Sequence, residues 1–387
     1  MPAKNAKEIR ISNLTNLYRA VLKSAPVTRK ALADKVNLSL MTVSTLVDQL
    51  IGLGLITTSP VKDNNKSGRK ADLLSPNVDD KRILVVDLTK YSYTYDVLDL
   101  QLESIIDSEY YDYDASLSYL SNLTKFYEQM RSRLESDGYF GKLTGVVVVA
   151  PGPFLSDKEL VINKRIPELS HIKIKDFTQS YFPDIITFVD EDVKFTAYSL
   201  LEHFADLDGK IAVYIYISEG VGGAMIHDLK IITGKTGIAG DVGQMMVSNN
   251  QNYEDVLSIH SLYRELTGVD TNNVNYSGTI SRLLMEKERN KEKFNSCLLE
   301  VHKNLTMLLY SITWLVNPDI VFIDCDYLCE IDPEYQTKIT EMLNEKFLEH
   351  EYHVPEFVSL ENNLKGSSRG GGLKALELFI KNAANNS

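Results

Sequence analysis

The chain has 387 residues, 44% of them hydrophobic and 24% charged, which is ordinary for a globular protein of two or three domains. Its net charge is −12, and no apolar run approaches the roughly 18 residues that cross a bilayer. These properties exclude a membrane-spanning protein.

The N-terminal sequence and the cysteines indicate a cytoplasmic location. The first 20 residues carry charges but lack the apolar core and the cleavage site of a signal peptide. Cys297, Cys325 and Cys329 form neither a disulfide framework nor a paired zinc motif. A reducing compartment is therefore expected.

Charge is distributed unevenly along the chain. Residues 1–75 contain 12 Lys and Arg against 5 Asp and Glu, a net charge of +7, whereas the remainder carries −19. A basic segment on an acidic body suggests a separate module for an anionic partner. Chance clustering of surface lysines is the alternative.

The first segment of the chain shows the periodicity of a helix. Apolar residues from Leu14 to Leu22 predict an amphipathic helix over about 10–24, which ends at a proline. Thr28 suits the N-cap of a second helix, and Ser39 the N-cap of a third that runs to about residue 54. Two helices joined by such a short turn are typical of a helix-turn-helix.

The third helix and the segment after it predict contacts to DNA. Hydroxyl groups on the side opposite the buried stripe can reach base edges and phosphates, and the first turn of a helix favours phosphate oxygens. Residues 55–60 and 71–76 read as two strands around a basic loop, a wing that can contact the backbone or a minor groove. A helical protein-interaction module is the alternative. The candidate DNA-contacting residues are Thr28, Arg29, Ser39, Thr42, Ser44, Thr45, Lys66, Arg69 and Lys70.

From Lys81 onwards strands alternate with helices, and buried strands end at polar or glycine-rich turns. This order predicts an α/β fold with ligand loops at the strand ends. The expected strands lie in "RILVVDLTKYSYTYDVLDL", "LTGVVVVAPGPF", "IITFVDED", "KIAVYIYISEGVGGAMI" and "DIVFIDCDYL".

Several stretches together resemble the ROK family (repressors, open reading frames and sugar kinases), in its repressor branch of the xylose and N-acetylglucosamine repressor type. They are "GRKADLLSPN", "GVVVVAPGPF", "VDEDVKFTA", "YISEGVGGAMI", "AGDVGQM" and "NPDIVFID", in the family's order and spacing. The resemblance implies an α/β fold class: an N-terminal winged helix-turn-helix plus a two-lobed, actin-like sugar-kinase body of the ATPase type.

The resemblance also implies domain boundaries. The winged helix-turn-helix would occupy residues 1–77 and the effector and dimerisation body residues 78–387. Within the body, the smaller lobe would span about 80–195 plus the C-terminal helix, and the larger lobe about 196–368.

The kinase chemistry of the family is altered at two places. Where the family has Asp-x-Gly-Gly-Thr, Thr89 and Lys90 replace the glycines that let the backbone approach ATP phosphates. In "SEGVG", Glu219 replaces a threonine and would repel a triphosphate. We therefore expect no enzyme activity, no catalytic residue and no cofactor, with the glycines of this turn shaping a hairpin.

The family's sugar-binding positions are partly kept. Asp192 matches the family's catalytic base and Glu191 stands where an asparagine is usual; a carboxylate still accepts bonds from sugar hydroxyls. The resemblance implies that relatives hold zinc in the loop that matches "AGDVGQMMVSNNQNYED", through a histidine and a cluster of cysteines. This chain has neither residue type there, so no zinc is expected. The candidate effector-binding residues are Glu191, Asp192, Asp241, Gln244 and Glu254. The alternative is that the loop residues satisfy one another and bind no effector.

The leading hypothesis is a transcriptional regulator, a repressor of carbohydrate uptake or catabolism genes. Its expected partners are a pseudo-palindromic double-stranded operator, a sugar or sugar-phosphate effector, and a second copy, as a homodimer or a dimer of dimers. Two alternatives stay open: an active sugar kinase that uses ATP, and a regulator whose body binds a partner protein.

Overall fold

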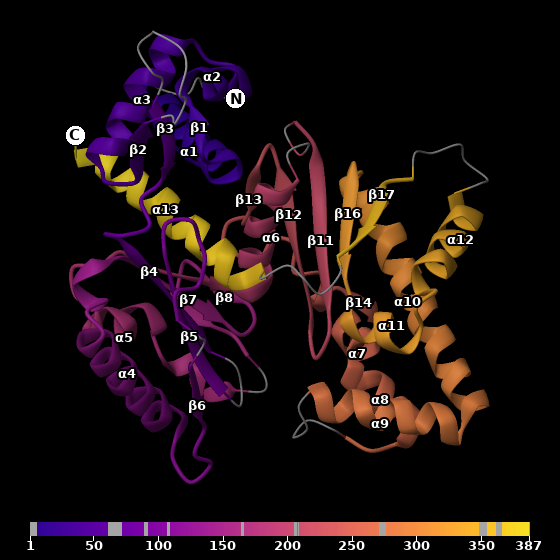
Figure 1. Cartoon of the computed structure of the whole chain (residues 1–387). Helices are drawn as coiled ribbons and strands as arrows, with labels where there is room; N and C mark the ends of the chain where they lie inside the picture. The colour runs from indigo at the N-terminus through magenta and orange to yellow at the C-terminus, as the bar shows by residue number, and fades with distance from the viewer. Residues whose placement is uncertain are drawn as a thin grey trace. The chain divides into compact units, whose positions relative to one another are not determined.

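The chain divides into two compact units, and each is described by itself (Figure 1). Unit 1 comprises Met1–Phe154, Lys158–Glu202 and Gly366–Ser387, and unit 2 comprises Leu155–Asp157 and His203–Lys365. The predicted boundary after residue 77 stays a prediction. The computed structural model describes residues 6–60, 72–88, 92–106, 109–163, 166–204, 207, 209–270, 276–347, 354–360 and 366–386.

Three helices and three short strands form the N-terminal part of unit 1, the head (residues 6–76). The helices bury the predicted apolar stripes against one another, and Leu17, Val43 and Leu50 are fully inaccessible to solvent. The three-stranded sheet has the order β1-β3-β2, and the strand β1 was not predicted. The elements are α1 (Ala6–Ser24), β1 (Val27–Thr28), α2 (Arg29–Val36), α3 (Leu40–Gly52), β2 (Ile56–Pro60) and β3 (Asp72–Pro76).

Local hydrogen bonds place the two helices of the predicted helix-turn-helix. The Thr28 hydroxyl accepts a bond from the amide of Ala31 at 3.3 Å, and the Ser39 hydroxyl accepts one from Thr42 at 3.1 Å. Each bond satisfies an amide that the first turn of a helix leaves unpaired. Asn37 ends α2 with a φ of 53°, a left-handed conformation that asparagine tolerates. Both predicted N-caps are confirmed.

The two predicted wing strands are confirmed as an antiparallel pair, with Ile56 opposite Pro76 and Pro60 opposite Asp72. The loop between them, which includes Lys66, Arg69 and Lys70, lies outside the described residues. Its predicted contacts to DNA stay a prediction.

The body of unit 1 is built on a five-stranded sheet of order β10-β7-β4-β5-β6. β4, β7 and β10 run parallel, and β5 and β6 are antiparallel. Side chains alternate between the two faces of a strand: Val146 and Val148 join the core beneath α4 and α5, whereas Val147 lies against Gly371 of α13. The elements are β4 (Arg82–Leu88), β5 (Ser92–Leu98), β6 (Glu109–Asp112), α4 (Tyr119–Ser136), β7 (Leu143–Ala150), β8 (Phe154–Leu155), β9 (Leu160–Val161), α5 (Ile174–Tyr181), β10 (Thr187–Glu191), α6 (Asp192–His203) and α13 (Gly366–Asn386).

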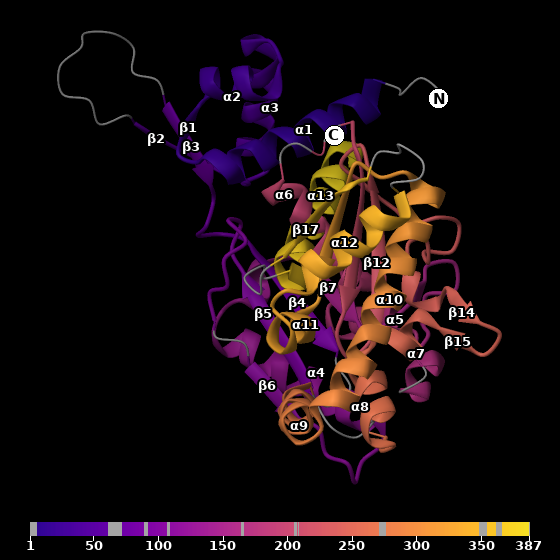
Figure 2. The same cartoon turned by 90° about the vertical axis from the view of Figure 1, so that its right-hand side faces the viewer.

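Helix α13 joins the sheet of unit 1 to the head. A Cβ placed on Gly145 of β7 would lie 3.1 Å from the Ala375 side chain, so the first half of α13 rests on the sheet. Its second half reaches α1 (Figure 2). There Glu377 pairs with Arg19. The Tyr18 hydroxyl also donates to the Leu100 carbonyl at 2.7 Å. A third contact is the bond from the Lys7 ammonium to the Asn385 carbonyl at 3.4 Å, and these contacts attach the head to the body.

Unit 2 also contains a five-stranded sheet, of order β13-β12-β11-β16-β17. β11, β16 and β17 are parallel, and β12 and β13 complete the sheet as antiparallel strands. The long helix α10 contributes Leu305 and Leu309, both fully buried, to the core over this sheet. The elements are β11 (Ile211–Ile217), β12 (Val221–His227), β13 (Lys230–Ile232), β14 (Met246–Ser248), β15 (Gln251–Asn252), α7 (Tyr253–Leu257), α8 (Ile259–Thr267), α9 (Tyr276–Arg289), α10 (Lys291–Val316), β16 (Ile320–Asp324), α11 (Asp326–Ile331), α12 (Tyr335–Phe347) and β17 (Glu356–Ser359).

Among the helices that the structure describes, each is too short or too polar to span a bilayer.

Candidate DNA-binding and effector sites

Helix α3 presents a polar face to solvent. Thr42 and Thr45 are exposed and Ser44 is half-buried. Val43 and Leu46, which flank Ser44 and Thr45 in the sequence, are buried. The Thr45 hydroxyl donates to the Met41 carbonyl at 3.1 Å, one turn back, and the Ser39 and Thr42 hydroxyls share a bond of 2.8 Å. The Thr45 hydroxyl therefore uses its proton inside the helix and keeps its lone pairs as acceptors.

Arg29 braces the helix-turn-helix from within. Its guanidinium donates to the Ser44 carbonyl at 2.9 Å and to the Asp48 carboxylate at 2.7 Å. The side chain thus ties the start of α2 to the middle of α3 and fixes the angle between the two helices. No pattern in the sequence predicted this role, because Arg29 and Asp48 lie 19 residues apart.

The end of β10 holds a buried ion-pair cluster in unit 1. Glu191 accepts bonds from the Lys194 ammonium at 2.5 Å and from the Phe154 amide at 3.0 Å, and Asp190 lies 3.4 Å from the same ammonium. Burial raises the pKa values of both carboxyl groups although Lys194 opposes the shift. The Glu191 carboxylate is therefore committed to structural partners, and its predicted effector contact stays a prediction.

Asp192 is the first residue of α6, and its carboxylate lies close to those of Glu191 and Asp87 in unit 1. Burial raises the pKa of Asp192 to about 6, opposed by a bond from the Val193 amide and helped by the charge of Glu191. Burial and the charges of Asp192 and Asp96 raise the pKa of Asp87 to about 7. The ends of β4 and β10 thus place Asp87 and Asp192 close enough to interact.

The loop from Ala239 to Asp255 is seated on β12 in unit 2. A Cβ on Gly243 would overlap the Val221 carbonyl, and a Cβ on Gly240 would lie 3.0 Å from the Cα of Ala224. Gly240 also has a φ of 93°, which side chains rarely adopt. Both glycines are therefore required for this close approach, and they hold Asp241 and Gln244 at the edge of the sheet.

A hydrogen-bond network orders the part of the loop around Gln244. The Asn252 side-chain amide donates to the Gln244 carbonyl oxygen at 3.3 Å. Asn252 and Asp255 also form a reciprocal capping box at the start of α7. The described residues contain no group of three or more His, Cys, Asp and Glu side chains placed to hold a metal ion.

The glycine-rich turn between β11 and β12 meets this loop. Ile217 pairs with Val221 across the turn, so the stretch is a tight hairpin. A Cβ on Gly220 would lie 3.6 Å from the Glu254 carboxylate, and Glu219 lies 3.4 Å from the His260 imidazole. The structure thus brings Glu254 to the hairpin and places Asp241, Gln244 and Glu254 in unit 2, while Glu191 and Asp192 belong to unit 1. Thr89 and Lys90 lie outside the described residues.

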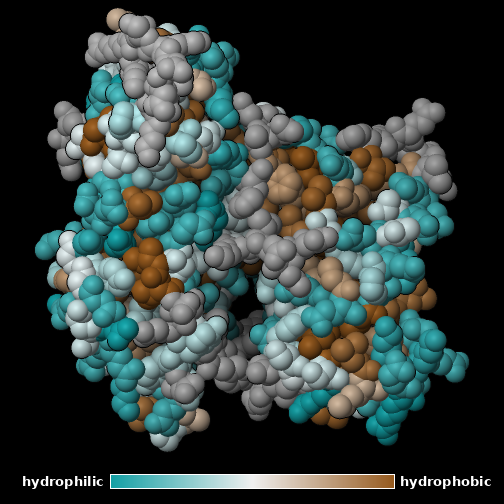
Figure 3. All heavy atoms as spheres, in the orientation of Figure 1, coloured by the Kyte–Doolittle hydropathy of each residue, from teal (hydrophilic) through white to brown (hydrophobic). Residues whose placement is uncertain are grey.

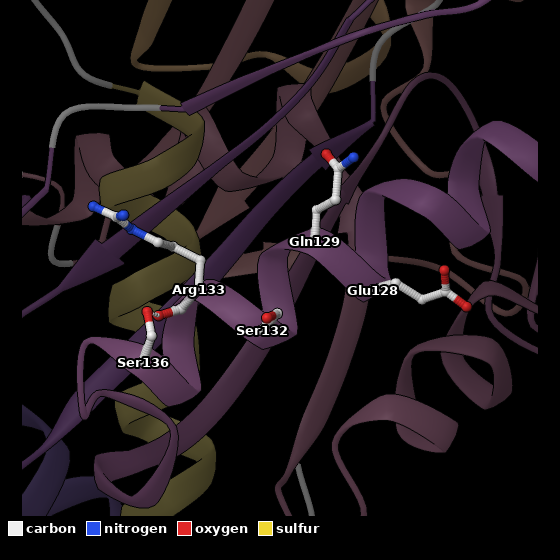
Figure 4. A pocket seen from close by; sticks show the side chains of 5 residues that line it. All are labelled: Glu128, Gln129, Ser132, Arg133 and Ser136. Atoms are coloured by element: carbon white, nitrogen blue, oxygen red, sulfur yellow. Dashed lines mark hydrogen bonds between the residues drawn. The ribbon is translucent and has the colours of Figure 1, made fainter.

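A shallow depression of about 450 Å³ lies on the outer surface of α4 (Figure 4). One helix supplies its whole lining, and none of the candidate residues belongs to it. It has no opposing wall to enclose a ligand and is separate from the sites above. The lining residues are Glu128, Gln129, Ser132, Arg133 and Ser136.

Comparisons with known proteins agree with this architecture. A family model described as the ROK family matches residues 120–368. The xylose repressor of Lactiplantibacillus pentosus is 21% identical over 341 residues, which cover 84% of this chain and 83% of that protein.

Two solved structures carry the fold comparison. A ROK family transcriptional regulator, a homolog of the E. coli MLC protein, superimposes with a TM-score of 0.74 at 16% identity, covering 98% of this chain and 100% of that one. A ROK hexokinase from Thermus thermophilus gives a TM-score of 0.60 at 15% identity, over 76% of this chain and 98% of that one. The predicted fold class, a winged helix-turn-helix with an actin-like sugar-kinase body, is confirmed.

Proposed function

We propose, from the premise that the chain belongs to the ROK family, that it is a DNA-binding transcriptional repressor whose body senses a sugar. The observation that carries the proposal is the head: a helix-turn-helix whose second helix, α3, exposes Thr42 and Thr45. The first 75 residues carry a net charge of +7, which suits a polyanionic partner. The similarity to a xylose repressor supports the same function.

The target is a pseudo-palindromic duplex bound by a homodimer or a dimer of dimers. A helix-turn-helix module reads one half-site, and two-fold related modules read two half-sites in adjacent turns of the DNA. The salt dependence of binding would report the number of phosphates that the heads contact.

The effector is a sugar or a sugar phosphate held by carboxylate and amide oxygens. In unit 1 the candidate acceptor for hydroxyl groups is Asp192. In unit 2, considered by itself, the candidate acceptors are Asp241, Gln244 and Glu254. A ligand shifts the repressor only through a difference in affinity between two arrangements of the heads.

Contacts inside unit 1 provide a route from Asp192 to the head. A Cβ on Gly366 of α13 would lie 2.5 Å from the Thr196 side chain, one turn after Asp192 on α6. Gly370 is packed on the Phe195 carbonyl of the same helix. Because Glu377 of α13 pairs with Arg19 of α1, a displacement of α6 would be transmitted through α13 to the head.

We further propose that the body does not transfer phosphate. The tight hairpin after β11 presents Glu219, which carries negative charge where a triphosphate would approach. The likeness to a ROK hexokinase keeps an ATP-dependent sugar kinase as the second candidate. Purified protein with ATP, Mg²⁺ and a panel of hexoses, pentoses and amino sugars decides between them, since a kinase releases ADP only with its own sugar.

The repressor function is tested by selecting duplexes from a random DNA pool with the full-length protein. The double variant Thr42→Ala/Thr45→Ala is expected to weaken binding to the selected duplex at least tenfold, while Ser132→Ala on α4 leaves it unchanged. A thermal-shift screen with sugars and sugar phosphates tests the sensor, since a bound effector raises the Tm with its concentration. No enriched duplex, or no Tm change with any sugar, would overturn the respective half of the proposal.

A further inference from the structure

On the face drawn in Figure 3, hydrophobic residues form several patches among hydrophilic ones. Among the large hydrophobic residues that the structure describes, Met41 is the most exposed, with 80% of its surface accessible to solvent. Met41 is the second residue of α3, within the turn that a helix-turn-helix directs at the base edges. The position of Met41 at the start of α3, together with its exposure, indicates that its side chain contacts a binding partner.

The chemistry of α3 limits how this helix reads bases. The segment Leu40–Gly52 contains no Lys or Arg, so it cannot make the bidentate contact by which those residues recognise guanine. Arg29, at the start of α2, is held by Ser44 and Asp48 of α3. The readout available to α3 is therefore apolar contact together with hydroxyl, amide and carboxylate groups.

Met41 stands on the same face as the polar residues of α3. Residues three and four apart lie side by side on a helix, and the Thr45 hydroxyl donates to the Met41 carbonyl at 3.1 Å. Met41, Thr42 and Thr45 line a groove of about 410 Å³ whose other wall is α1, including Arg10. Arg10 thus provides a cation close to the apolar Met41. This pair is complementary to a DNA strand, on which phosphates lie near thymine methyl groups.

We propose that Met41 is a specificity-determining residue that contacts the C5-methyl group of a thymine in the major groove. The thymine methyl is the apolar feature of the major-groove edges, and side chains of this kind recognise it by contact. Methionine is flexible and polarizable, which suits it to such a contact. The inference rests on the proposed DNA-binding function and names the base that one residue of α3 reads.

Single thymine-to-uracil replacements test this contact, because they remove the methyl group and keep every hydrogen-bonding atom. The duplex selected with the full-length protein is prepared with deoxyuridine at each thymine in turn, and affinities are measured by fluorescence anisotropy. At one position in each half-site the replacement is expected to weaken binding about fourfold, the equivalent of one buried methyl group. Met41→Ala is expected to bind the thymine and uracil duplexes equally at that position.

Two further variants keep the test sharp. Met41→Gln preserves the length of the side chain and the helix propensity, and it is expected to lose the same discrimination. Met285→Ala on α9, where 71% of the methionine surface is exposed, is expected to keep it.

Unchanged discrimination in Met41→Ala, or a uracil scan without any effect, would overturn the inference while the repressor function stands. Failure to select any duplex would overturn both.

Discussion

The guanidinium of Arg19 on α1 pairs with the carboxylate of Glu377 on α13, 358 residues further along the chain. Only 13% and 19% of the two side chains are exposed to solvent. A charge that loses its partner in such surroundings is costly. The pair therefore fixes the head on the helix that also packs against α6.

A double-mutant cycle measures this coupling. Arg19→Met and Glu377→Gln, alone and together, are expected to give a coupling energy of about 1–3 kcal/mol in the free energy of unfolding by urea. The exposed pair Arg131 and Glu135, one turn apart on α4, serves as the control and should couple by about 0.5 kcal/mol or less. Equal coupling in the two cycles would contradict a special role for the α1–α13 contact.

Two glycine substitutions are expected to change stability in opposite directions. Gly370→Ala would force the backbones of α13 and α6 apart, because a Cβ there overlaps the Phe195 carbonyl; a loss of about 2–3 kcal/mol and a lower Tm follow. Gly52→Ala meets no atom within 4 Å in the last turn of α3, so it should gain up to about 1 kcal/mol. Calorimetry of both variants checks the signs, and a neutral Gly370→Ala would refute the close packing.

The capping box at Asn252 should control the order of the loop on β12. Asn252→Ala removes the cap of α7 and the bond to Gln244, with an expected loss of about 1 kcal/mol in local stability. Hydrogen exchange at the amides of Tyr253 and Asp255 should accelerate about fivefold. Asn290→Ala, which removes the N-cap of α10, should leave exchange in this loop unaltered; faster exchange there would indicate a global rather than a local effect.

The stability of the protein should depend on pH through Asp87. Its folded pKa is raised to about 7, whereas an unfolded aspartate titrates near about 4. Between these values the folded state holds the extra proton, so this group's contribution to stability falls as the pH rises and levels off above about 7. The Tm of Asp87→Asn minus that of the wild type should therefore increase from pH 5 to pH 8. A difference that stays constant over this range would show that Asp87 titrates alike in both states.

Local signals in the sequence sufficed for the three helices and the two wing strands of the head, and for the alternation of strands and helices in the body. Thr28 and Ser39 cap their helices with bonds to amides three residues away, so the signal and its effect lie in one short segment. The hairpin shape of the turn at Gly220 followed from its glycines in the same way. The two-residue strand β1 carried no such signal, because it exists only through pairing with β3, where Val27 lies opposite Leu74 and Thr28 opposite Leu73.

The hydrogen-bond partners of the candidate effector residues could not be predicted from the sequence. The residue types predicted that Glu191 and Asp192 are acceptors, but not that Lys194 and the Phe154 amide already occupy Glu191. Likewise, the loss of metal ligands around Gln244 was evident in the sequence, whereas its bond to Asn252 depends on how the loop folds back. Such partners are set by tertiary packing and leave no periodic pattern.

Helix α13 has a consequence for the order in which the protein is made. The whole of His203–Lys365 is synthesised before Gly366–Asn386 can leave the ribosome, yet the latter belongs to unit 1. Unit 2 is thus free to fold first, as domains made earlier generally do, while the head and the sheet of unit 1 wait for the last 21 residues of their structure. A nascent chain halted before Gly366 would carry α3 but no Glu377, so the finished contact between Arg19 and Glu377 marks a chain whose translation has passed α13.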